Sequence, residues 1–131
     1  MVWVNIVTLA ALVQLLLFAH FVGSARGKYG IKAPATTGHP TFEAWFRVQA
    51  NTVEMSIAFL PALWIAARYW PPHYAALAGL VYLIGRTLFA QGYVKQPDKR
   101  GLGFGISYMA TAALIVAALV GAVRELLSHQ A

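Results

Sequence analysis

Long apolar runs make up most of the chain, and short polar segments separate them. Four of these runs are long enough to cross a bilayer, because a helical span needs about 20 apolar residues. We expect helices over about 2–24, 42–70, 73–94 and 102–127. The pattern therefore predicts an all-α integral membrane protein, a four-helix bundle that forms a single domain over residues 1–131.

The first apolar run, from Val2 to Gly23, contains no charged residue. A secretory signal peptide is the alternative interpretation, but its apolar core would be about 7–15 residues long and would follow positive charge. No Lys or Arg precedes Val2 and the run is longer, so we interpret it as a retained helix. Residues 24–41 are rich in Gly, Pro and basic residues, which predicts a loop with Thr41 as the N-cap of the next helix.

Proline residues mark the second helix. Pro61 lies inside it and predicts a kink, which membrane helices tolerate when neighbouring groups satisfy the freed carbonyl. Pro71 and Pro72 predict its end. A polar link at 95–101 separates the third helix from the fourth.

Composition agrees with a bilayer environment. The chain is 60% hydrophobic and 11% charged, and a soluble domain usually carries about twice that charged share. It has no cysteine, which excludes disulfides and thiolate metal sites. Its histidines are scattered without a pair at ligand spacing, so we expect no metal site. The net charge of +6 also suits nucleic-acid binding, but the charges flank apolar runs, so we expect the lipid bilayer as partner and no nucleic acid.

The distribution of basic residues predicts the orientation. Six lie on the side that holds the first and third loops: Arg26, Lys28, Lys32, Lys95, Lys99 and Arg100. Only Arg68 and Arg124 lie on the side that holds the second loop and both termini. Because Lys and Arg concentrate in cytoplasmic loops, the first and third loops are expected to face the cytosol. The membrane would be a bacterial inner membrane or that of the endoplasmic reticulum.

Charged residues inside the predicted spans are the main candidates for chemistry, since such charges are expensive in a membrane. On the second helix, Arg47, Asn51 and Glu54 have the spacing i, i+4 and i+7, which places them on one face. Arg86 lies deep in the third helix and shares a stripe with Tyr93 and two other aromatic residues. Because Arg forks match carboxylates, the two stripes predict a polar pocket for a small anionic or zwitterionic ligand.

A purely structural interpretation stays open at this point. Glu54 and Arg86 would neutralise each other as an ion pair, and polar side chains would hold the helices together. Aromatic residues would anchor the chain at the membrane interface, and basic residues would only set its orientation. The residues to which this interpretation applies are Arg26, Asn51, Glu54, Tyr82, Arg86, Tyr93 and Arg100.

The same segments resemble one protein family, the membrane-associated proteins in eicosanoid and glutathione metabolism, or MAPEG. This family includes microsomal glutathione transferases and leukotriene-C4 synthase. The segment FRVQANTVE at 46–54 is close to the family pattern R-x-Q-x-N-x-x-E. Further matches are GLVYLIGR at 79–86, FAQGY at 89–93 and PATTG at 34–38.

The resemblance implies a homotrimer of four-helix subunits that binds glutathione as co-substrate between subunits, at the cytosolic side. The implied glutathione-binding residues are Arg26, Arg47, Gln49, Asn51, Glu54, Arg86 and Tyr93, with Gln49 reaching in from the adjoining subunit. Arg100 matches the position of the arginine proposed to stabilise the glutathione thiolate, which makes it the implied catalytic residue. The implied protein is a membrane-bound glutathione S-transferase that conjugates glutathione to lipophilic electrophiles. The resemblance also implies peroxidase activity and a role in detoxification.

Three positions depart from the family pattern. Phe89 stands where relatives with glutathione chemistry often have Tyr, Met55 where some have Tyr, and Gly27 where a second basic residue is found. These departures leave a non-catalytic protein of the same fold, which presents lipids to a partner, as the alternative function. An unrelated structural membrane subunit is the third hypothesis.

Overall fold

The computed structural model describes residues 1–96, 98 and 100–130 of the chain. Lys99, which contributes to the predicted orientation, lies outside the described residues. The described part is all-helical, without a strand, as predicted. Its four helices are long and apolar enough to cross a membrane: α1 Val2–Tyr29, α2 Pro40–Tyr69, α3 Pro72–Lys95 and α4 Arg100–Gln130.

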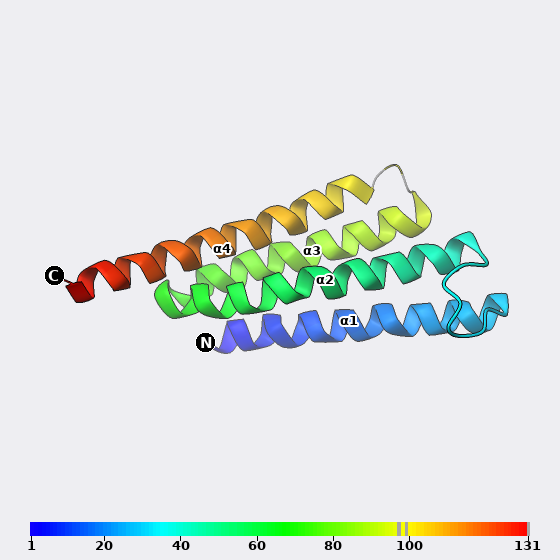
Figure 1. Ribbon diagram of the computed structural model, residues 1–131, viewed down its shortest axis with the longest axis horizontal. Helices are drawn as coiled ribbons and strands as arrows, with labels where there is room; N and C mark the ends of the chain where they lie inside the picture. Colours follow the sequence, from blue (N-terminus) through cyan, green and yellow to red (C-terminus); the bar gives the residue numbers. More distant parts are fainter. Residues whose placement is uncertain (97, 99, 131) are drawn as a thin grey trace.

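The four helices run side by side, with both termini at one end of the bundle (Figure 1). The α1–α2 loop, the end of α3 and the start of α4 lie at the other end. α1 and α4 each pack against α2 and α3, whereas no close contact joins α1 to α4 in the described part. α2 and α3 are therefore the central pair, and they carry most of the predicted site residues.

The first helix is longer than predicted, so the expectation that the loop starts at residue 24 is wrong. It continues to Tyr29 and ends where Gly30 adopts the left-handed conformation, with φ 67°. The backbone N–H of Ile31 then donates to the carbonyl of Arg26 at 3.0 Å, which closes the helix end as in a Schellman motif. Gly23 and Gly27 lie within α1 and do not end it, whereas Gly30 has a positive φ and turns the chain out of the helix.

The second helix starts earlier than predicted, and Thr41 is not its N-cap. His39 holds that position, and its Nδ1 accepts a hydrogen bond from the Thr41 N–H at 3.1 Å. Pro40 occupies the first turn of α2, and Pro72 begins α3. Both positions suit proline, whose missing N–H would be unpaired in a first turn anyway.

Glycine lets α3 and α4 approach so closely that their backbones touch. A Cβ added at Gly103 would overlap the backbone of Phe89, and one added at Gly85 would lie 2.7 Å from the backbone nitrogen of Ser107. Small residues at helix contacts are the usual means of close packing in a membrane. This contact fixes how α4 side chains meet α3, and it places Ser107 beside Arg86.

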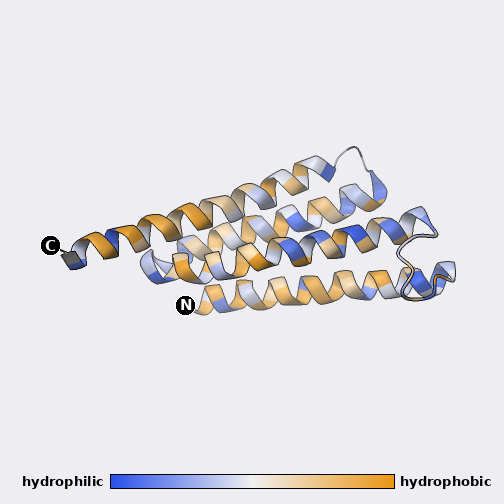
Figure 2. Ribbon diagram, in the orientation of Figure 1, coloured by the Kyte–Doolittle hydropathy of each residue, from blue (hydrophilic) through white to orange (hydrophobic). Residues whose placement is uncertain are grey.

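The surface of the bundle divides into an apolar part and a polar end. Large hydrophobic side chains point outward along its length, with Leu16 and Ile57 each 72% exposed. Figure 2 shows hydrophilic colours on the first half of α2 and hydrophobic colours on its second half. The polar half of α2 lies toward the end with the α1–α2 loop and the start of α4, the end that the sequence predicts to hold a pocket.

Candidate functional site

Arg86 is the most buried charged residue of this end, with no exposed surface. Its Nη1 donates to Asn51 Oδ1 at 2.6 Å and to Thr52 Oγ1 at 3.3 Å. Its Nε and Nη2 both donate to Ser107 Oγ, at 3.0 and 2.8 Å. The guanidinium also lies 4.4 Å from the centre of the Phe89 ring. Arg86 therefore joins α2, α3 and α4 at one point.

The partners of Arg86 are neutral oxygen atoms. Among the described residues, no ion pair joins it to Glu54, so the structural interpretation that paired these two charges is wrong. Asn51 does contact a neighbouring helix, as that interpretation expected. Because no carboxylate neutralises Arg86 there, its positive charge is left to act on whatever occupies the adjacent space.

That adjacent space is an open pocket of about 280 Å³. Side chains from α2, α3 and the start of α4 line it: Arg47, Asn51, Phe89, Tyr93, Arg100, Gly101 and Phe104. Four of the predicted site residues, Arg47, Asn51, Tyr93 and Arg100, are thus brought together within one subunit. Arg86 stands behind the wall, in contact with Asn51 and Phe89.

Arg100 and Tyr93 form the mouth of this pocket. The Arg100 side chain is exposed, and its guanidinium carbon lies 4.9 Å from the centre of the Tyr93 ring. Such a cation–π contact holds the guanidinium while leaving its N–H groups free to donate. The Tyr93 ring in turn packs edge-on against Phe89, with 5.5 Å between centres.

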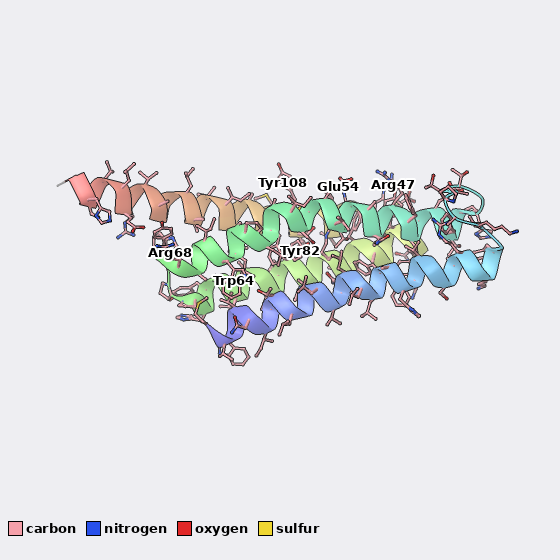
Figure 3. All side chains as sticks on the ribbon, turned by 60° about the horizontal axis from the view of Figure 1, so that its bottom comes forward. Arg47, Glu54, Trp64, Arg68, Tyr82 and Tyr108 are labelled. Atoms are coloured by element: carbon pink, nitrogen blue, oxygen red, sulfur yellow. The ribbon has the colours of Figure 1, made fainter. Side chains whose placement is uncertain are left out.

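The remaining predicted residues do not line this pocket. Arg26 donates to the carbonyl of Ala35 at 2.7 Å and lies over the Phe42 ring at 4.7 Å, so it braces the α1–α2 loop. Gln49 is half-buried and Glu54 is exposed. Figure 3 shows Arg47 and Glu54 projecting from the same side of α2, as their spacing predicted.

Sequence reasoning missed Ser107 and Thr52, the two hydroxyls that hold Arg86. Both are buried. A hydroxyl inside an apolar span is a signal for a helix–helix hydrogen bond, and Ser107 stands in such a run. Its partner depends on how α3 and α4 pack, which spacing along one helix does not show.

A second, larger space lies along the outside of α3 and α4. It is a groove of about 740 Å³ lined by apolar residues: Ala78, Val81, Gly101, Leu102, Gly105, Ile106, Met109, Ala110 and Ala113. Without a charged or hydrogen-bonding side chain, it suits hydrocarbon and not a peptide. Gly101 lines both this groove and the polar pocket.

Comparison with known proteins identifies relatives over most of the chain. The sequence model of the MAPEG family matches residues 4–120. An uncharacterized protein of Synechocystis sp. is 41% identical over 126 residues, which cover 96% of this chain and 92% of that protein. Microsomal glutathione S-transferase 2 of Homo sapiens is 40% identical over 112 residues, 86% of this chain and 76% of that protein. Leukotriene C4 synthase of Bos taurus is 38% identical over 121 residues, 90% and 78% of the two chains.

Proposed function

This chain is an integral membrane protein that belongs to the MAPEG family, and we propose that it is a glutathione S-transferase acting on lipophilic electrophiles. The similarity to microsomal glutathione S-transferase 2 supports this proposal. The observation that carries it is the pocket in which Arg47, Asn51, Tyr93 and Arg100 converge. Family membership excludes the hypothesis of an unrelated structural subunit.

The chemistry of the pocket suits glutathione, a tripeptide with two carboxylates, one ammonium group and a thiol. Arg47 and Arg100 supply guanidinium groups that pair with carboxylate or thiolate. The buried charge of Arg86 adds attraction for an anion from behind the wall. Glu54 supplies the carboxylate that would accept the ammonium group.

Arg100 would act on the thiol. A free thiol has a pKa of about 8.5, so only a small fraction is ionised at neutral pH, and a nearby guanidinium favours the thiolate, which is the nucleophile. The thiol proton passes to water, because an Arg side chain stays protonated and has no acceptor. The sulfur electron pair then forms the C–S bond as the bond to the leaving group breaks; with an epoxide, the C–O bond breaks and the oxygen takes a proton from water.

The same thiolate would also reduce lipid hydroperoxides. Two glutathione molecules are oxidised to one disulfide, and the hydroperoxide is reduced to an alcohol and water. This peroxidase reaction needs no group beyond those of the conjugation site.

Assembly into a homotrimer would complete the site. Arg47 and Glu54 are exposed in the single subunit, although they lie in a helix that is long and apolar enough to cross a membrane. Charges that face lipid are costly, so such residues normally face protein or a polar cavity. A neighbouring copy would cover them, and its Gln49 would reach the bound glutathione. A monomeric mass in mild detergent with full activity would contradict this assembly.

The electrophile would enter from the bilayer, which serves as its reservoir. The apolar groove between α3 and α4 meets the polar pocket at Gly101, next to Arg100. A hydrocarbon chain in that groove would bring its reactive end toward the thiolate.

Phe89 favours a second candidate, a lipid-presenting protein of the same fold without chemistry. Its ring lies in the pocket wall and offers no hydroxyl, where the resemblance leads us to expect Tyr in catalytic relatives. Such a protein would bind its ligands and release them unchanged.

Turnover of a model aryl halide by the purified protein in detergent distinguishes the two functions. The transferase should form the glutathione conjugate in proportion to protein, and Arg100→Ala should lower the rate strongly. Glutathione binding without conjugation of any of several electrophiles would favour the lipid-presenting protein. Absence of glutathione binding would refute the proposed site.

A further inference from the structure

We propose that Ser107 is a positioning residue of the glutathione site, acting through Arg86 on the amide of Asn51. This inference rests on the proposed function, because it concerns how the same pocket recognises glutathione. Ser107 itself does not line the pocket. Its effect is carried by two hydrogen-bonded neighbours.

The Ser107 hydroxyl is fixed in place because it uses its full hydrogen-bonding capacity. Its oxygen accepts from both Nε and Nη2 of Arg86, at 3.0 and 2.8 Å. Its own proton goes to the α4 backbone, where the carbonyls of Gly103 and Phe104 each lie at 3.0 Å. A hydroxyl has one proton and two lone pairs, so all of them are used. Ser107 therefore anchors the guanidinium to the backbone of α4.

While Ser107 is in place, the surroundings hold Arg86 in one orientation. The side chain is fully buried, and its Nη1 is already bound to Asn51 and Thr52. The close contact of α3 and α4 at Gly103 leaves the two helices no room to slide together further. Loss of the Ser107 oxygen would leave two N–H groups without that acceptor, and the guanidinium would turn to satisfy them.

The position of Arg86 determines which end of the Asn51 amide faces the pocket. A guanidinium only donates hydrogen bonds, so only the Oδ1 atom of Asn51 can lie 2.6 Å from Nη1. The NH2 group of the same amide points away from that bond and, among the described residues, has no hydrogen-bond partner, so it can donate to a ligand in the pocket that Asn51 lines. Asn51 thus recognises an acceptor, a carboxylate or a peptide carbonyl of glutathione. A flipped amide would present its oxygen and repel that group.

Glutathione affinity of purified variants tests this arrangement by calorimetry in detergent. Ser107→Ala removes the hydroxyl, and Ser107→Cys keeps nearly the same volume with a much weaker acceptor. Both should weaken glutathione binding roughly tenfold. The matched control is Thr111→Val, one turn along α4, since the buried Thr111 hydroxyl donates only to the carbonyl of Ser107. This control should keep its affinity within about twofold.

A double-mutant cycle separates positioning from general loss of packing. In an Asn51→Ala background, Ser107→Ala should have little further effect on glutathione affinity, because the group that it positions is gone. The pH at which bound thiol ionises should stay unchanged in Ser107→Ala, since Arg100 is untouched. Equal affinities in wild type and both Ser107 variants, or additive effects in the cycle, would overturn this inference alone. Failure of the wild-type protein to bind glutathione would overturn the proposed function and this inference with it.

Discussion

The guanidinium carbon of Arg100 lies 4.9 Å from the centre of the Tyr93 ring, so the proposed catalytic residue rests on an aromatic face at the pocket mouth. This contact needs the ring and not its hydroxyl. Tyr93 would assist the reaction in one of two ways. Its ring would hold Arg100 through this contact, or its hydroxyl would donate a hydrogen bond to sulfur.

Replacing Tyr93 tests these alternatives. Tyr93→Phe keeps the ring and should retain most of the conjugation rate. Tyr93→Leu removes the cation–π contact and should lower the rate roughly threefold to fivefold. The measurement is kcat with glutathione at saturation. A much slower Tyr93→Phe enzyme would show that the hydroxyl, not the ring, is the active feature.

Close packing of α3 on α4 predicts a large difference between two neighbouring glycines. Gly103→Ala places a Cβ against the backbone of Phe89, whereas Gly105→Ala meets no atom within 4 Å. Overpacking usually costs about 1–3 kcal/mol and more when backbone must move, so Gly103→Ala should unfold at a clearly lower temperature in detergent. Gly105→Ala should unfold at or above the wild-type temperature, since Ala favours the helix. Equal losses in both variants would mean that α3 and α4 do not pack as described.

Much of the fold could be predicted because lipid imposes a simple rule on sequence. Spans must be apolar for about 20 residues, and Pro71-Pro72 separates two of them plainly. The helix ends were harder to predict. Nothing in the composition of 24–29 distinguishes the last turns of α1 from a loop, and the stop depends on the left-handed turn at Gly30. The N-cap at His39 was missed because its ring nitrogen takes the place that Ser or Thr usually holds.

Residue spacing along single helices predicted part of the site, but it did not predict contacts between helices. Spacing placed Arg47 and Asn51 on one face of α2, and they share one pocket. The partners of Arg86 were not predictable, because they depend on how deeply α4 packs against α3 at Gly85 and Gly103. The argument from charge alone paired Arg86 with Glu54. In the structure, Arg86 instead donates to three neutral oxygen atoms.

Glu54 should bind the ammonium group of glutathione, since it projects from α2 on the same side as Arg47 (Figure 3). Glu54→Gln keeps the shape and removes the charge. Charge-assisted hydrogen bonds contribute about 1.5–3 kcal/mol, so the dissociation constant should rise by roughly one to two orders of magnitude. Glu125→Gln, at the opposite end of the bundle, is the control and should bind normally. Unchanged affinity in a folded Glu54→Gln protein would show that this carboxylate has only a structural part.

The predicted orientation places the first and third loops in the cytosol. The chain has no cysteine, so single cysteines can be labelled without background. Thr37→Cys and Asp98→Cys should react with a membrane-impermeant reagent from the cytosolic side only. His73→Cys, in the first turn of α3, should react from the other side only. The reverse pattern would place the glutathione pocket away from the cytosol and refute the proposed access of glutathione.

The absorbance of the glutathione thiolate in the bound complex, measured against pH, tests the central claim most directly. With the wild-type protein, the midpoint should lie below the value of about 8.5 for a free thiol, because the Arg100 guanidinium stabilises the charged form. Arg100→Ala should move the midpoint up toward the free value. Arg100→Lys should restore only part of the shift, since an ammonium group lacks the planar fork. Coincident curves for all three proteins, each with glutathione bound, would contradict the assignment of Arg100 as the residue that activates the thiol.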